Sequence, residues 1–119
     1  NLDLKKTFDG IKISSGNSFV HETESQVILN GSYNINFTMD LVEKDMSLFN
    51  KLSKDKNVEL EIAPFVLDIF KDAKKKFGSR AWSSMVVKRL EDKYGINFRE
   101  KGFPEELIDY EPEEKGQEV

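Results

Sequence analysis

A strict alternation of apolar and polar residues marks the middle of the first half of the chain. Every odd position from Tyr33 to Leu41 is apolar and every even position is polar. A period of two places all the apolar side chains on one face of a strand. Asn30-Gly31 comes just before this run and follows the apolar stretch 26–29, and Asn-Gly is a strong signal for a tight hairpin turn. The pattern predicts a β-hairpin over 25–41.

Shorter alternations lie on either side of this hairpin. Ile11 and Ile13 share one face of a predicted strand over 10–14, which we expect to pair with a strand over 18–22. Residues 58–62 alternate again and predict a further strand. Between these strands, Met46, Phe49 and Leu52 recur every third residue, which predicts a short helix near 45–52.

The second half of the chain has the period of helices. Apolar residues spaced by three and four predict a helix over 64–77, with Pro64 in its first turn and Gly78 as its C-terminal cap. A second helix is expected over 80–94, with Trp82, Val86 and Leu90 on its apolar side.

These elements together predict an α+β fold. An antiparallel β-sheet of residues 10–62, interrupted by the short helix near 45–52, packs against the two helices 64–77 and 80–94. We expect one domain over 1–103, followed by an acidic and partly disordered tail over 104–119, which contains two prolines and few apolar residues.

The composition of the chain excludes several kinds of active site and metal site. The 119 residues include no cysteine and one histidine, which excludes thiolate sites, disulfides and paired-histidine metal sites. No glycine-rich phosphate loop occurs, and 22 acidic residues single out no catalytic pair. We therefore predict a protein that is not an enzyme, with no cofactor and no metal. No signal peptide or long apolar run is seen, so we expect a cytoplasmic protein that does not bind membranes.

Charge is unevenly distributed along the chain. The formal net charge is −4. Residues 1–57 carry −1, residues 58–103 carry +3, and residues 104–119 carry −6. A basic segment beside an acidic tail is typical of a surface that meets a charged partner, and also of solvated faces.

The basic segment over 71–101 makes nucleic-acid binding the alternative function. Two helices joined by Gly78-Ser79 could present cations to phosphates, as a helix-turn-helix does. The strand expected before them would turn Glu59 and Glu61 toward a DNA groove, which makes it a poor reader of bases. The candidate nucleic-acid-binding residues are Lys71, Lys74, Lys75, Arg80, Lys88, Arg89 and Lys93.

The acidic tail makes a protein partner the first choice, because a net negative chain suits a basic partner surface better than DNA. Lysine is favoured over arginine, a bias of AT-rich genomes. We therefore predict a small non-enzymatic binding protein of a bacterium or of a phage or plasmid, which acts through protein–protein interaction as an inhibitor or an assembly or regulatory factor. The sequence leaves open whether the protein forms a homodimer. The candidate partner-binding residues are Glu105, Glu106, Asp109, Glu111, Glu113 and Glu114.

Overall fold

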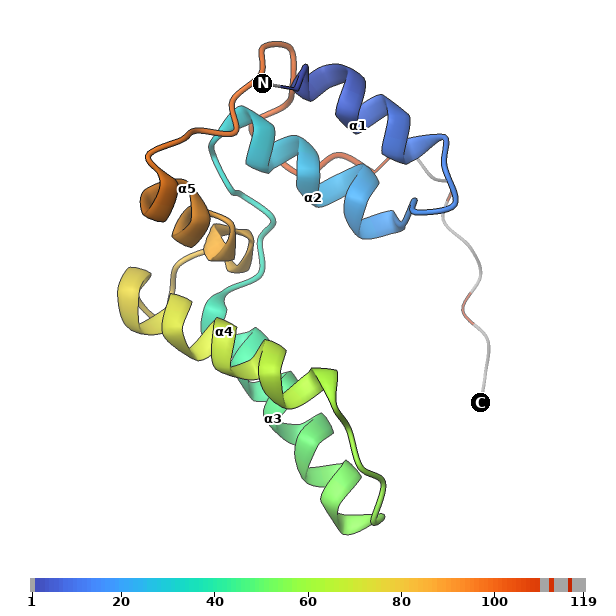
Figure 1. Ribbon diagram of the computed structural model, residues 1–119, viewed down its shortest axis with the longest axis vertical. Coiled ribbons are helices and arrows are strands. Elements are labelled where there is room, and N and C mark those ends of the chain that lie inside the picture. Colours follow the sequence, from blue (N-terminus) through green and yellow to red (C-terminus); the bar gives the residue numbers. More distant parts are fainter. Residues whose placement is uncertain (1, 110–111, 113–115, 117–119) are drawn as a thin grey trace.

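Helices form all the regular secondary structure of the described residues. The computed structural model describes residues 2–109, 112 and 116. The elements, shown in Figure 1, are five α-helices and one short 3₁₀ helix: α1 (Leu4–Lys12), α2 (Phe19–Asn30), α3 (Met39–Asp55), α4 (Ile62–Phe77), η1 (Ser83–Val86) and α5 (Lys88–Tyr94).

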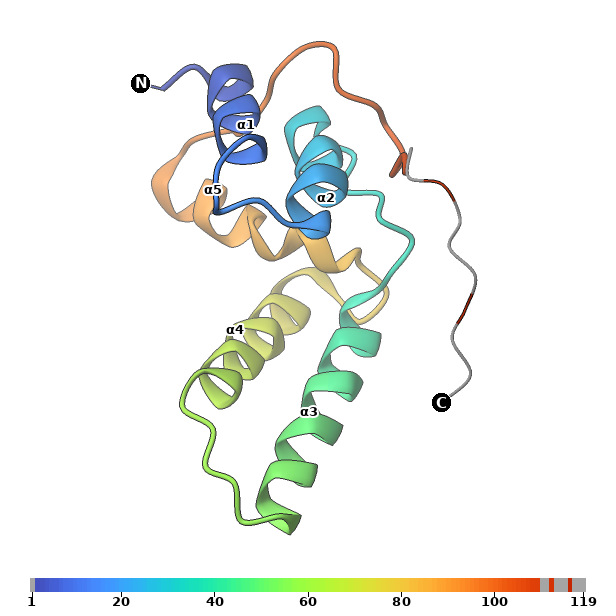
Figure 2. The ribbon, with the colours of Figure 1, turned by 90° about the vertical axis from the view of Figure 1, so that its right-hand side faces the viewer.

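The helices form two parts. α1 packs against α2 at one end of the molecule, while α3 and α4 form an antiparallel hairpin that projects from the other end (Figures 1 and 2). The short helix η1 lies between the two parts, where it contacts α2, α4 and α5. Val27 and Met39, which have no solvent exposure, mark the core near this junction.

The predicted hairpin over 25–41 is wrong, and with it the α+β fold. Gln26–Leu29 is part of α2, and Gly31, at φ +97°, is the left-handed cap that ends this helix. Asn-Gly therefore ends a helix here, because the positive φ that suits a hairpin turn also suits a helix cap. Val27 and Leu29 are both buried although they point to different sides of the helix, because α2 is covered on more than one side.

The alternating run 33–41 crosses between the two parts as an irregular segment. Tyr33 and Asn36 adopt φ of +56°, which interrupts any regular strand. Short backbone pairings replace a sheet: the Met39 amide donates to the Ala81 carbonyl at 2.9 Å, and the Ser83 amide donates to the carbonyl of Phe37 at 2.8 Å. Tyr33, Ile35 and Met39 are buried in this irregular segment and Phe37 is 37% exposed, so the alternation does not mark a strand of a sheet.

The other predicted strands are also wrong. Residues 10–12 belong to α1, and residues 19–22 open α2, where the Ser18 hydroxyl accepts from the His21 amide at 3.0 Å. Residues 58–61 form the irregular connection between α3 and α4. Ser18 is thus an N-cap, a role for which serine is preferred because its oxygen satisfies a free backbone amide.

The helical half is closer to the expectation, with different boundaries. The short helix near 45–52 lies inside the 17-residue α3, and the helix over 64–77 lies inside α4. The single helix over 80–94 is replaced by η1 and α5, which follow each other at Val87. Among the described residues, we find no helix whose length and apolar character would suffice to cross a membrane.

Candidate functional site

Among the described residues, the buried polar side chains other than hydroxyl groups lie in two places. The first is the cluster of Tyr33, Glu91 and Arg99. The second is Asn50, between α3 and α4. Because a buried polar group is costly unless it is hydrogen-bonded, the partners of these side chains decide which place could bind a ligand.

Glu91 has a complete set of partners. Its side chain is 1% exposed. Oε1 accepts from the Phe98 amide at 2.8 Å and from Arg99 Nη1 at 2.7 Å, and Oε2 accepts from the Tyr33 hydroxyl. Arg99 Nη2 in turn donates to the Tyr33 oxygen at 2.6 Å. The cluster therefore joins the segment after α2 to α5 and to the segment after α5.

The surroundings of this cluster determine the protonation states of Glu91 and Tyr33. Burial raises the pKa of Glu91, but the hydrogen bonds from Tyr33, the Phe98 amide and Arg99 outweigh it and leave that pKa below its usual value. Burial, reinforced by Glu91, raises the pKa of Tyr33. Glu91 is thus an anion and Tyr33 a neutral donor at pH 7. Because both carboxylate oxygens of Glu91 already accept hydrogen bonds from this chain, the cluster has a structural role and is not a binding site.

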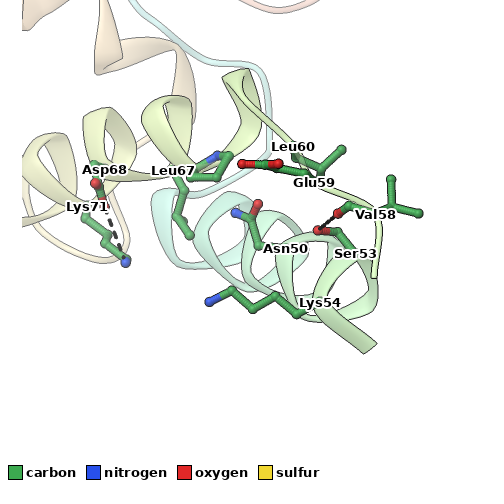
Figure 3. A pocket seen from close by; sticks show the side chains of 10 residues that line it. Asn50, Ser53, Lys54, Val58, Glu59, Leu60, Leu67, Asp68 and Lys71 are labelled. Carbon is green, nitrogen blue, oxygen red and sulfur yellow. Dashed lines mark hydrogen bonds and ion pairs between the residues drawn. The ribbon is translucent and has the colours of Figure 1, made fainter. Parts of the chain in front are cut away.

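Asn50 differs because its side-chain amide has no partner. Asn50 lies on α3 and is 9% exposed, yet neither its Nδ2 nor its Oδ1 atom forms a hydrogen bond in the structure. It lines a cleft of about 320 Å³ that lies between α3, the connection 58–60 and α4 (Figure 3). The cleft is the candidate functional site; its lining residues are Asn50, Ser53, Lys54, Val58, Glu59, Leu60, Pro64, Leu67, Asp68 and Lys71.

The cleft is lined by both apolar and charged side chains. Lys54 and Lys71 are balanced by Glu59 and Asp68, and Lys71 Nζ lies 3.5 Å from the Asp68 carboxylate. The Ser53 hydroxyl donates to the Val58 carbonyl at 2.8 Å and so ties the connecting segment to α3. Such a site can hold a small ligand of no net charge.

Sequence reasoning missed this cleft, because it expected a short helix near 45–52 and a strand over 58–62 instead of the long helix α3 and an irregular connection beside α4. One signal was available. Asn50 follows Phe49 and precedes Leu52 within an apolar helical pattern, and a polar residue on the inner side of such a pattern indicates a special role.

The residues predicted to bind nucleic acid do not form one free basic face. They lie on α4, α5 and the segment between them, and five of the seven have carboxylate partners. The shortest of these pairs are Lys74–Glu43 at 2.6 Å and Arg89–Asp72 at 2.7 Å, and the others are Lys71–Asp68, Arg80–Asp40 and Lys88–Asp92. Lys75 lies in the last turn of α4, and the Lys93 ammonium lies 5.2 Å from the centre of the Tyr94 ring.

The predicted partner-binding residues lie partly outside the described chain. Glu105 and Glu106 run beside residues 32–34: the Glu105 carbonyl accepts from the Ser32 hydroxyl at 2.6 Å, and Glu106 forms a parallel bridge with Asn34. Asp109 is described, and Glu111, Glu113 and Glu114 lie outside the described residues. A partner-binding role for this segment stays a prediction.

Comparison with known proteins adds one finding. The family model described as "NAD-binding of NADP-dependent 3-hydroxyisobutyrate dehydrogenase" matches residues 1–90. No curated protein matches the chain. The match overturns the predictions of a non-enzymatic protein, of a phage or plasmid regulatory factor and of a nucleic-acid-binding regulator, because it relates the chain to a dehydrogenase.

Proposed function

Because the chain belongs to the family of the NAD-binding domain of NADP-dependent 3-hydroxyisobutyrate dehydrogenase, we propose that it serves as a helical domain of an NAD(P)-dependent dehydrogenase whose substrate is a small hydroxy acid. In this function the chain packs against a separate nucleotide-binding domain and completes the enzyme. The match over residues 1–90 is the observation that carries the proposal.

A dinucleotide does not fit the described residues alone. The usual cradle for its pyrophosphate is a glycine-rich loop that leads from a strand into a helix N-terminus. The sequence has no Gly-x-Gly-x-x-Gly motif, and the described residues form no strand.

The helix N-termini of the described residues also do not suit the pyrophosphate of a dinucleotide. The N-terminus of each of the four longer helices already has a carboxylate of this chain, which would repel a phosphate there. These carboxylates are Asp3 for α1, Glu22 for α2, Asp40 for α3 and Glu61 for α4. In the proposed enzyme, therefore, the pyrophosphate is held chiefly by the other domain.

An exposed apolar surface supports packing against another domain. Ile62 is 74% exposed and Phe65 is 67% exposed at the start of α4, and Phe49 on α3 is 53% exposed. A shallow apolar groove lies between the two helices and is lined by Met46, Phe49, Leu60, Glu61, Ile62, Ala63 and Val66. Apolar residues grouped in this way on one surface mark a site of interaction.

The total surface supports the same conclusion. The chain exposes 8981 Å², whereas a folded monomer of this mass exposes about 6,600 Å². Even when the residues after 109 are counted as fully exposed, an excess of roughly 1,000 Å² remains. A standard protein–protein interface covers about 800 Å² on each partner. The chain thus has enough surplus surface for one interface with a second domain.

The test uses the isolated nucleotide-binding domain of a 3-hydroxyisobutyrate dehydrogenase as the partner. We expect the 119-residue chain to bind it in isothermal titration calorimetry, and the mixture to reduce NADP⁺ with 3-hydroxyisobutyrate, measured as absorbance at 340 nm. The double variant Ile62→Ser/Phe65→Ser should lose binding at least tenfold. The control Ile13→Ser, at a residue that is 88% exposed but lies after α1, should bind as the unchanged chain does.

Two results would contradict the proposal. One is absence of binding and of NADPH formation by the mixture. The other is binding that the double variant on α4 leaves unchanged.

A further inference from the structure

The unpartnered amide of Asn50 is the strongest unexplained feature of the described residues. A buried amide that lacks hydrogen bonds costs about 1–3 kcal/mol for each unsatisfied group, and here both the donor and the acceptor are unsatisfied. Figure 3 shows the side chain between α3 and α4, beside Leu67 and below the connecting segment. A ligand that supplied an acceptor and a donor together would satisfy both atoms.

The form of the Asn50 amide determines which ligand groups fit it. Nδ2 donates and Oδ1 accepts, in one plane and about 2.3 Å apart as in any amide. A primary carboxamide presents the complementary pair, and so does the edge of adenine, with which asparagine forms two parallel hydrogen bonds. A carboxylate offers acceptors alone and an ammonium offers donors alone, so either would leave one Asn50 atom unpaired.

The charged residues that line the cleft favour a neutral ligand. Two lysines and two acids line it, so their formal charges cancel. Lys71 is also engaged with Asp68 at 3.5 Å. An anion therefore gains no net attraction here, and neither does a cation.

The size of the cleft sets the upper limit of the ligand. Its volume of about 320 Å³ is at the lower end of the range for small-molecule sites. The apolar residues of its lining are Val58, Leu60, Pro64 and Leu67. Both amide atoms of Asn50 are shielded from bulk water in this structure, so binding requires the side chain to turn toward the opening of the cleft.

From these observations we infer that the cleft between α3 and α4 binds a small neutral ring compound through a planar donor–acceptor edge, and that Asn50 recognises this edge. The edge belongs to a carboxamide or to an adenine base. This binding site goes beyond the proposed dehydrogenase function and does not depend on it, because it rests on α3 and α4 alone.

The experiment is a titration of the ¹⁵N-labelled full chain, followed by NMR. The probes are benzamide for the carboxamide, adenosine for the base, and benzoate as the charged analogue of benzamide. We expect benzamide or adenosine to shift the Asn50 side-chain amide and the backbone amides of 53–60 and 67–71. Benzoate should bind at least tenfold more weakly than benzamide.

Two variants test the role of Asn50. Asn50→Leu keeps an apolar side chain between the helices and should weaken binding of the active probe at least tenfold. Ser47→Ala, an exposed position on the same helix, should leave binding unchanged. A response to benzamide alone identifies the carboxamide as the ligand group, and a response to adenosine alone identifies the base.

Three results would overturn the inference. They are no response to benzamide and adenosine at 20 mM, equal binding of benzoate and benzamide, and undiminished binding to Asn50→Leu. The dehydrogenase proposal survives each of them, because its test measures association with a nucleotide-binding domain.

Discussion

Arg99 Nη1 donates to Glu91 Oε1 at 2.7 Å, and this pair links the segment after α5 to the buried side of α5 itself. The guanidinium also reaches back to α2, where the same nitrogen lies 3.2 Å from the Ile28 carbonyl. The pair holds together segments that are far apart in the sequence, since α2 and Arg99 are separated by about 70 residues. It therefore helps to hold the end of the molecule that contains α1 and α2 against the segment after α5.

Replacing Arg99 by Met should destabilise the chain strongly. The change leaves Glu91, which is 1% exposed, without its counter-ion, and removal of one partner of a buried pair costs about 3–5 kcal/mol. Urea unfolding followed by circular dichroism measures the loss. The control Arg89→Met breaks the exposed pair with Asp72 and should cost less than about 1 kcal/mol. Equal losses in the two variants would contradict the role given to Glu91.

The stability of the chain should depend on pH through Glu91. Its pKa is lower in the folded chain than in the unfolded chain, because the hydrogen bonds outweigh burial. Its ionised form therefore contributes stability above about pH 4.3, the unfolded value, and this contribution disappears as the pH falls through the folded pKa. The free-energy difference between the unchanged chain and Glu91→Gln should be largest near pH 6 and should shrink toward pH 3. A difference that is constant across this range would show that Glu91 does not titrate as described.

Gly31 should tolerate no side chain, for two separable reasons. Its φ is +97°, and a Cβ atom built on it would lie 2.3 Å from Nε of Arg99. Gly95 is also in the left-handed region, at φ +62°, but has open space around its Cβ position. Gly95→Ala should therefore cost about 1–2 kcal/mol for the backbone alone, and Gly31→Ala should cost clearly more. Unfolding midpoints of the two variants measure the difference, and equal costs would place Arg99 elsewhere in solution.

The sequence predicted burial only in part. Tyr33, Ile35 and Met39, three of the five inward positions of the expected strand, are buried, whereas Phe37 is 37% exposed. Their segment is nevertheless irregular, because positive φ at Tyr33 and Asn36 and pairing with residues 81–83 cannot be read from a local pattern. The alternation therefore indicated some of the covered side chains, but tertiary contacts determine the backbone conformation that carries them.

The candidate site was harder to predict than the helices. The stripe of α4 is long and regular, so its position is close to the expectation. Glu91, in contrast, lies on the side of the expected helix that seemed exposed, and it is buried because Arg99 and Tyr33 cover it from distant segments. Asn50 likewise depends on the approach of α4. Sites made by such long-range contacts leave little trace in a single sequence.

Replacing Asn50 by Leu should stabilise the isolated chain. The substitution removes two buried polar atoms that lack partners and places an apolar side chain of similar size against Leu67 between α3 and α4. Each unsatisfied group costs about 1–3 kcal/mol, so we expect the free energy of unfolding to rise by roughly 1–3 kcal/mol. Urea unfolding measures the change. Asn50→Ala should gain less, because it removes the same polar atoms but leaves a cavity beside Leu67. If Asn50→Leu were instead less stable than the unchanged chain, the Asn50 amide would have a hydrogen-bond partner in solution.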